Sequence, residues 1–167
     1  RDIRSLSQIA DLISFRHLLQ LIALRNAQVL NQSELARDAK LNVVTTNRYL
    51  SLMEASFVIF RLHPHLGNRS SRLIKSPKIY LSDTGIAAYL SGARKLDANE
   101  PLRGALVAGY VAQNLQGILS VHSPESKLTY WNIQGRFEVD FIIETDLKTL
   151  AIEVKYSIAS RDRNQFP

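Results

Sequence analysis

Acidic, basic and apolar side chains alternate in two short stretches towards the end of the chain, residues 137–144 and residues 150–155. Side chains two positions apart on a β-strand share one face. The polar residues 145–149 between the stretches suit a hairpin loop. The pattern therefore predicts a β-hairpin on which Asp140, Glu153 and Lys155 converge on one patch.

Two carboxylates and a lysine in one patch could bind Mg²⁺ and direct a water molecule at a phosphodiester. Mg²⁺ prefers a few carboxylate oxygens plus water ligands, and it lowers the pKa of a bound water. In this hypothesis Asp140 and Glu153 are the metal ligands, while Lys155 orients the water or faces the scissile phosphate. The alternative is a hairpin whose solvent-facing side carries Glu153–Lys155 or Asp140–Lys155 ion pairs, each worth roughly 0–1 kcal/mol. The pattern leaves both hypotheses open.

The overall composition is that of an ordinary globular protein. Of the 167 residues, 46% are hydrophobic and 22% are charged. The sequence contains no cysteine, which excludes disulfides and thiolate metal sites. It shows no signal peptide and no apolar run long enough to span a membrane, so we expect a cytoplasmic location and no membrane partner. Because the chain begins at Arg1 and stops abruptly at Pro167, we expect it to be a fragment of a longer protein.

The net charge of +6 is unevenly distributed. Residues 1–100 carry 14 Lys and Arg against 8 Asp and Glu, whereas residues 101–167 carry 7 of each kind. An excess of basic residues in one part of a chain favours contact with a polyanion such as duplex DNA, although it also serves solubility.

The first half of the chain has the pattern of a helix-turn-helix. An amphipathic helix is predicted from Leu6 to Arg25, and a shorter helix from about Gln32 to Ala39 is capped by Asn31. A tight turn at residues 40–42 leads into a longer helix that ends near Ala55. Such a second helix places its first residues in a major groove. The residues expected on its exposed face are Thr45, Thr46, Asn47 and Arg48, beside Lys40 in the turn, whereas those expected in the shared core are Leu35, Ala36, Leu41, Val44, Leu50 and Met53.

A basic loop between two strands follows this helix pair. The strands are predicted at residues 57–62 and 78–81, and no acidic residue occurs between Ala55 and Ser82. This arrangement resembles the wing of a winged helix, whose loop follows phosphates. The alternative is a generic three-helix module for packing or dimerisation with a solvated basic loop. The basic residues of this segment are Arg61, Arg69, Arg72, Lys75 and Lys78, of which Arg69, Arg72 and Lys75 are the candidate DNA contacts.

The second half predicts a helix followed by strands. Asp83 and Thr84 can cap a short helix that Gly92 ends, and residues 94–101 form the best linker candidate. A longer helix is predicted over residues 104–119 and a strand over residues 128–133, which leads into the hairpin. We therefore expect an α+β chain with a winged helix-turn-helix domain over residues 1–93 and a second domain over residues 101–167. The stripe of the longer helix that we expect against the sheet is Ala105, Ala108, Ala112 and Leu115.

The order of these motifs resembles a known family. The helix, the strands, Asp140 and the Glu153-Val154-Lys155 triplet resemble the restriction-endonuclease-like fold with its D…(D/E)xK signature. Nearly the whole chain is similar to the uncharacterised C-terminal region of a family of prokaryotic AAA-type ATPases. In that family, a P-loop ATPase domain precedes a winged helix and a PD-(D/E)xK nuclease-like domain. The matching stretches are residues 1–3, 35–37, 48–50, 75–80, 83–85, 138–141 and 153–155.

Two departures from the family pattern bear on activity. The chain contains no G-x-x-x-x-G-K-[ST] motif, so ATP binding is expected only in an N-terminal domain outside this sequence. Where the family usually carries a glutamate, this chain has Ala108, and Gln113 and Glu138 are poorly placed substitutes. The resemblance also implies a further helix and strand after Lys155, so we expect the nuclease-like domain to be truncated at its C-terminus.

Three functions remain open from the sequence. The first is a DNA-binding, regulatory C-terminal region of an AAA-type ATPase with a weak or inactive nuclease-like domain. The second is a Mg²⁺-dependent DNA endonuclease that uses Asp140, Glu153 and Lys155. The third is a protein-interaction module that docks on its own ATPase domain or on a second copy as a homo-oligomer.

Overall fold

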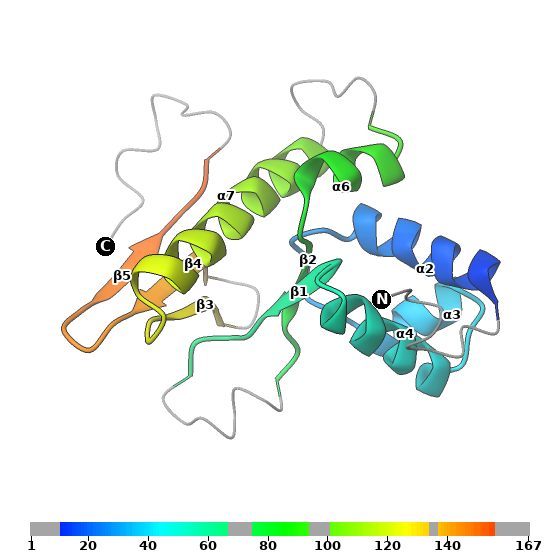
Figure 1. Ribbon diagram of the computed structural model, residues 1–167, viewed down its shortest axis with the longest axis horizontal. Coiled ribbons are helices and arrows are strands. Elements are labelled where there is room, and N and C mark those ends of the chain that lie inside the picture. Colours follow the sequence, from blue (N-terminus) through cyan, green and yellow to red (C-terminus); the bar gives the residue numbers. More distant parts are fainter. Residues whose placement is uncertain (1–10, 67–74, 94–100, 134–136, 156–167) are drawn as a thin grey trace.

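The computed structural model describes residues 11–66, 75–93, 101–133 and 137–155, which form an α+β fold (Figure 1). None of the helices in these ranges is long and apolar enough to cross a membrane. The elements, in chain order, are α2 (Leu12–Leu24), α3 (Gln32–Asp38), α4 (Val43–Ala55), β1 (Ile59–Leu62), β2 (Lys78–Leu81), α6 (Thr84–Leu90), α7 (Pro101–His122), β3 (Lys127–Ile133), β4 (Phe137–Glu144) and β5 (Thr149–Ile152).

Local sequence sets where several helices begin. The side chains of Asn31, Asn42 and Asp83 each accept a hydrogen bond from a backbone N–H in the first turn of α3, α4 and α6. These bonds satisfy donors that have no partner within the helix. Gly92 follows α6 with a φ of 76°, a conformation that glycine adopts at little cost. The predicted caps at Asn31 and Asp83 and the predicted end of α6 are confirmed, whereas the cap at Asn42 was not predicted.

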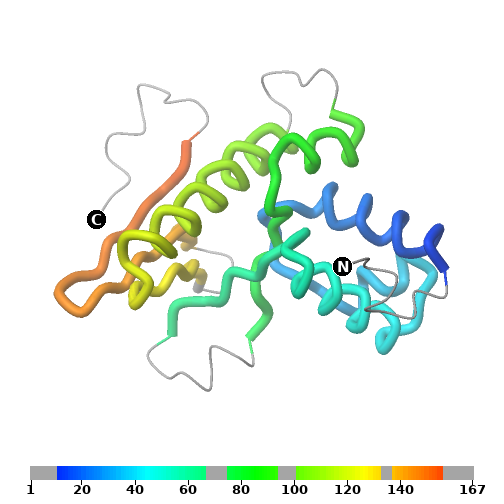
Figure 2. Tube along the Cα trace, viewed as in Figure 1, coloured from blue at the N-terminus to red at the C-terminus, as the bar shows by residue number. Residues whose placement is uncertain are grey.

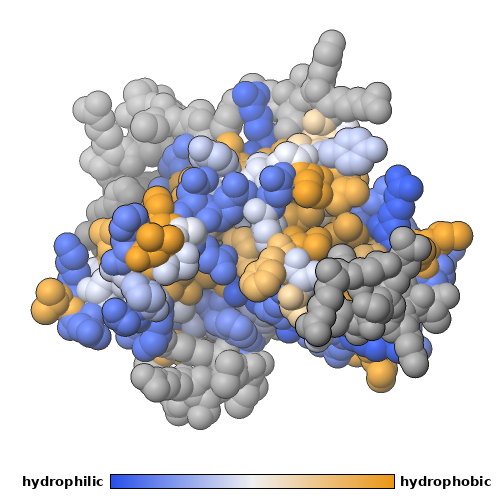
Figure 3. All heavy atoms as spheres, viewed as in Figure 1, coloured by the Kyte–Doolittle hydropathy of each residue, from blue (hydrophilic) through white to orange (hydrophobic). Residues whose placement is uncertain are grey.

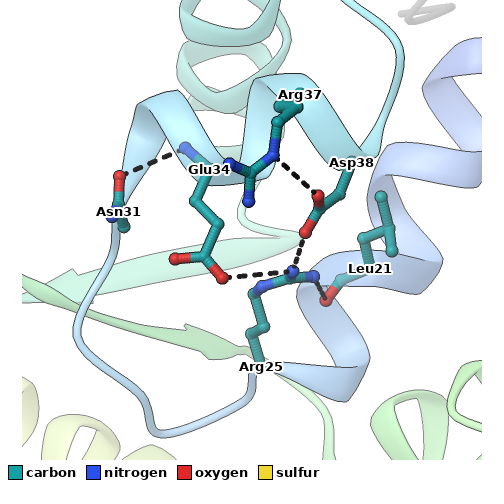
Figure 4. A network of polar contacts seen from close by, with 6 residues as sticks. All are labelled: Leu21, Arg25, Asn31, Glu34, Arg37 and Asp38. Carbon is teal, nitrogen blue, oxygen red and sulfur yellow. Dashed lines mark hydrogen bonds and ion pairs between the residues drawn. The ribbon is translucent and has the colours of Figure 1, made fainter.

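The helices α2, α3 and α4 pack around one apolar core against the β1–β2 strand pair. Leu18, Ile22, Leu35, Leu50 and Met53 are buried in this core, together with Ile59 and Ile79 from the strands. A polar network fastens α2 to α3 at its edge (Figure 4). In that network the Arg25 guanidinium contacts the Asp38 carboxylate, and its Nη2 lies 3.9 Å from Glu34 Oε1.

The segment that follows β1 runs to β3 and links the two halves of the chain (Figure 2). β1 and β2 form an antiparallel pair, while β3, β4 and β5 form an antiparallel sheet in that order. Beyond β1, Pro64 pairs in parallel with Tyr130 of β3. A second apolar cluster fills the space between these sheets and α7, and its buried members are Leu62, Tyr80, Ala112, Tyr130 and Phe141.

Asn26 joins α2, β2 and α7 at one buried point. Its side chain is 1% exposed. Its Nδ2 donates to the Ala105 carbonyl oxygen at 3.0 Å, and its Oδ1 accepts from the Leu81 N–H at 2.9 Å. A buried amide with both ends bonded fixes the relative position of the three elements, because each lost bond would leave a desolvated polar group.

The structure corrects several sequence-based expectations. Val44 was expected in the core but is 80% exposed, because it lies on a side of α4 that none of the described elements covers. α7 is longer than predicted and runs from Pro101 to His122. The start of the first predicted helix, residues 6–10, lies outside the described residues.

Apolar side chains are unevenly spread over the visible face of the molecule. Figure 3 shows them gathered over α6 and the adjoining part of α2, whereas at the end that carries the β4–β5 hairpin they are interspersed with polar side chains. On the hairpin, Phe137, Leu147 and Leu150 are 66%, 96% and 51% exposed. The end of the molecule that carries the hairpin is therefore mixed in polarity.

Candidate functional site

The predicted hairpin brings Asp140 next to the segment that carries Glu153 and Lys155. β4 and β5 pair antiparallel with Phe141 opposite Ile152, so continuing this register by one step sets Asp140 opposite Glu153. Asp140 Oδ2 accepts a hydrogen bond of 2.9 Å from the Val154 N–H. Asp140 therefore contacts the backbone of residues 153–155, while the convergence of the Asp140, Glu153 and Lys155 side chains on one site stays a prediction.

Glu153 and Lys155 form an ion pair with each other. The Lys155 Nζ lies 3.0 Å from Glu153 Oε1, and the two side chains are 49% and 25% exposed, respectively. Residues 153–155 follow β5 and are outside the strand itself. The solvated Glu153–Lys155 pair is the alternative that the sequence pattern had left open.

The residue that sequence reasoning missed is Lys78 on β2. It was grouped with the basic loop, yet its side chain is only 5% exposed. Its Nζ contacts Glu138 Oε1 and lies 3.7 Å from Asp140 Oδ1. The same ammonium is 5.4 Å from the centre of the Tyr130 ring, which is within cation–π range. Strand pairing explains the burial, because Lys78 lies opposite Leu62 and shares its face.

Two buried tyrosines adjoin this charge cluster. Burial raises the pKa of the Tyr80 phenol, and the negative charges of Asp140 and Glu138 raise it further. Burial, and then Glu138, raises the pKa of Tyr130, whose hydroxyl donates to the Ser76 carbonyl oxygen at 2.7 Å. The Tyr80 hydroxyl is buried and has no hydrogen-bond partner among the described residues. Both phenols are therefore neutral at physiological pH.

These residues do not fit a resident Mg²⁺ ion as they are arranged. One Asp140 oxygen accepts a backbone N–H, while the other lies beside the Lys78 ammonium, which also contacts Glu138. Within the described ranges, no group of three or more His, Asp or Glu side chains is placed to hold a metal. Ala108, at the position where the resembled family carries a glutamate, is buried and adds no oxygen. Catalysis by Asp140, Glu153 and Lys155 stays a prediction.

The predicted nucleic-acid face is only partly as expected. Lys40, Arg48 and Lys75 are exposed, and Thr45 and Asn47 are partly exposed. Thr46 was expected on this face, but it is fully buried and its hydroxyl donates to the Asn42 carbonyl oxygen at 3.0 Å. Its position four residues after Asn42 turns it towards the start of the helix and the core. Arg69 and Arg72 lie outside the described residues.

Residues that were not predicted also belong to this face. Val43 and Val44 are 42% and 80% exposed at the first turn of α4. Lys40 adopts a φ of 56° in the turn before that helix. The guanidinium of Arg48 lies 5.6 Å from the centre of the Tyr49 ring. The start of α4 therefore offers a basic and apolar surface to solvent.

Residues 1–97 match a family described as a domain of unknown function, DUF8612. The chain belongs to the DUF8612 family. Residues 103–166 match a second family, described as the domain of unknown function DUF4143. Lys78 therefore comes from the DUF8612 part, whereas Glu138 and Asp140 come from the DUF4143 match. The charge cluster is a contact between the two matched regions.

Two curated relatives resemble this DUF8612 chain along most of its length. Each is described as an uncharacterized protein, one from Mycobacterium tuberculosis and one from Mycobacterium bovis. Each is 30% identical over 157 residues, which cover 93% of this chain and 35% of the relative. The chain thus spans about a third of the length of these curated relatives. No solved structure matches it.

Proposed function

We propose that this chain is the DNA-binding, regulatory region of an AAA-type ATPase, with a nuclease-like second half that is weak or inactive. The observation that carries the proposal is the solvent-facing side of the first half of α4, which follows α3 after a tight turn. Lys40 and Arg48 flank this surface, and small polar and apolar side chains lie between them. A helix presented in this way suits a major groove, where its basic residues contact phosphates and its first turn meets base edges.

The charge distribution and the second matched family support the same proposal. The whole excess of positive charge falls in residues 1–100, which include the helix pair. DUF4143 regions are typically found in AAA-ATPase-associated proteins. The curated relatives extend well beyond the matched region, which leaves room for an ATPase domain.

A salt titration of duplex DNA binding by the full chain tests this function. Binding driven by phosphate contacts must weaken steeply with salt, with a log–log slope of about −0.9 for each phosphate neutralised. Fluorescence anisotropy with a labelled duplex at several KCl concentrations measures the slope. Absence of binding at low salt would remove the proposal.

A Mg²⁺-dependent endonuclease is the second candidate, and the position of Asp140 beside residues 153–155 favours it. The engagement of Asp140 and Glu138 by Lys78 counts against it. Incubation of supercoiled plasmid with Mg²⁺ or Mn²⁺ compares the unchanged protein with Lys155→Ala. Nicking that Lys155→Ala abolishes would establish the endonuclease, whereas equal nicking by both proteins would indicate a contaminating enzyme.

A docking role on the ATPase domain or on a second copy is the third candidate. Sedimentation velocity of the chain, alone and mixed with the ATPase domain of the same protein, distinguishes this docking role from DNA binding. A complex without DNA affinity would replace the first proposal by this one.

A further inference from the structure

The Glu138 and Asp140 carboxylates form a cluster with the Lys78 ammonium as their cation. The side chain is 5% exposed, so the ammonium has exchanged water for protein groups. Those groups are the Glu138 carboxylate in direct contact, Asp140 Oδ1 at 3.7 Å and the face of the Tyr130 ring. A buried charge is tolerated only where opposite charges and hydrogen bonds compensate for the lost water. Lys78 and the two carboxylates therefore depend on one another.

We propose that Lys78 serves as a built-in cation that occupies the place of a divalent metal ion and ties β2 to β4. The DUF8612 part of the chain thereby supplies the counter-charge for carboxylates of the second matched region. The inference does not depend on DNA binding by the α4 surface, so either proposal can fail while the other stands.

The surroundings of the cluster explain why a metal ion would not displace the lysine. The other Asp140 oxygen already accepts the Val154 N–H. Mg²⁺ demands near-octahedral oxygen ligands and loses its water reluctantly. Among the described residues, the other ionisable neighbours of the cluster are Tyr80 and Tyr130, which are neutral phenols near neutral pH, and Glu153, whose carboxylate is paired with Lys155. An incoming ion would therefore meet an ammonium of like charge and few free oxygens.

The same geometry predicts a latent metal site. Replacing Lys78 by methionine keeps the length and apolar character of the stem but removes the charge. Glu138 and Asp140 would then face each other across the vacated position with no cation between them. A hard divalent cation such as Mn²⁺ or Mg²⁺ is the ligand class that suits two such carboxylates.

Mn²⁺ binding to the full chain tests the proposal, measured by electron paramagnetic resonance and by the thermal midpoint with and without Mn²⁺. We expect Lys78→Met to bind Mn²⁺ at least roughly tenfold more tightly than the unchanged protein. A change of this size is typical when a group next to a metal ligand is replaced. Its midpoint should rise with Mn²⁺, and adding Asp140→Asn should abolish both effects. Lys148→Met, which removes an exposed lysine at the β4–β5 turn, is the matched control and should bind Mn²⁺ like the unchanged protein.

A measurement on the unchanged protein covers the case in which Lys78→Met does not fold. Bound Mn²⁺ broadens the nuclear magnetic resonance signals of nearby amides, and the Val154 N–H lies at Asp140. A Val154 signal that Mn²⁺ leaves sharp supports the built-in cation. A selectively broadened Val154 signal, or a folded Lys78→Met variant without any gain in Mn²⁺ binding, overturns it.

Discussion

Asn26 and Gly109 approach each other so closely that a β-carbon on the glycine would stand 2.5 Å from the Asn26 Nδ2. The asparagine bonds the Ala105 carbonyl in the preceding turn of α7 and the Leu81 N–H of β2. The φ of Gly109 is not in the left-handed region, so its backbone conformation does not require a glycine. The close approach of Asn26 does require one, because a β-carbon has no room there. This contact sets how α7 sits against the rest of the molecule.

Gly109→Ala should destabilise the protein. We expect a loss of about 1–3 kcal/mol in the free energy of unfolding, as for other overpacked sites, because the methyl group would displace the Asn26 amide from its bonds. Urea denaturation followed by circular dichroism measures the change. Gly117→Ala in the same helix is the control, since nothing lies within 4 Å of its added β-carbon. That control should gain about 0.5–1 kcal/mol from helix propensity.

Arg48→Ala should weaken duplex binding and flatten its salt dependence. Removing one phosphate contact lowers the magnitude of the log–log salt slope by about 0.9. The variant also loses the contact with the Tyr49 ring, which costs about 0.5–1 kcal/mol of stability. Anisotropy titrations well below the unfolding midpoint keep the two effects apart. Lys148→Ala, at the exposed β4–β5 turn, should leave the slope unchanged.

Lys40→Gly should raise stability and lower DNA affinity at once. Lys40 has a φ of 56°, which a side chain disfavours, so glycine should add about 0.5–1 kcal/mol to the free energy of unfolding. The substitution also removes an exposed charge from the proposed DNA surface. Lys40→Ala keeps the backbone strain and should lose affinity without the gain in stability. If Lys40→Gly retained full affinity in anisotropy titrations, Lys40 would not belong to the DNA surface.

Stability should fall in alkaline solution because of Tyr80 and Tyr130. The pKa of each phenol is raised from 10.0 in the folded protein, so the unfolded chain releases these protons first as the pH rises. Their contribution is fully present below about pH 10 and is lost above it, by up to about 1.4 kcal/mol per pH unit for each group. Denaturation curves collected from pH 8 to pH 11 measure this loss.

Tyr80→Phe isolates the buried phenol. The variant should show a shallower alkaline loss, and at neutral pH it should be as stable as the unchanged protein or slightly more stable. The reason is that the buried Tyr80 hydroxyl has no partner within the part of the chain that the structure describes, so its removal relieves a desolvated polar group. Tyr89→Phe, at a side chain that is 73% exposed, is the matched control. An unchanged alkaline slope in Tyr80→Phe would contradict the assignment.

Local features of the chain could be predicted without coordinates. Asn31, Asn42 and Asp83 cap helices because their short side chains bond the next turn of their own segment. The β4–β5 hairpin could be predicted for the same reason, since alternation and a short polar turn act within neighbouring residues. The nearness of Asp140 to residues 153–155 followed from the strand period.

Contacts between distant segments could not be predicted in this way. Helical periodicity does not tell which side of α4 its neighbours cover, so Val44 was placed in the core and Thr46 on the surface, the reverse of what the structure shows. Lys78 and Asp140 are 62 positions apart, and a lysine beside a basic loop has the same local pattern whether solvent or carboxylates surround it.

The sequence by itself determined the helices, most of their caps and the hairpin, because each depends on residues within a turn or a strand of one another. Only the tertiary structure decided that an ammonium from β2 contacts Glu138 and lies beside Asp140. The physical reason is desolvation, because a charge becomes costly, and must be paired, only after distant segments have packed together and removed its water.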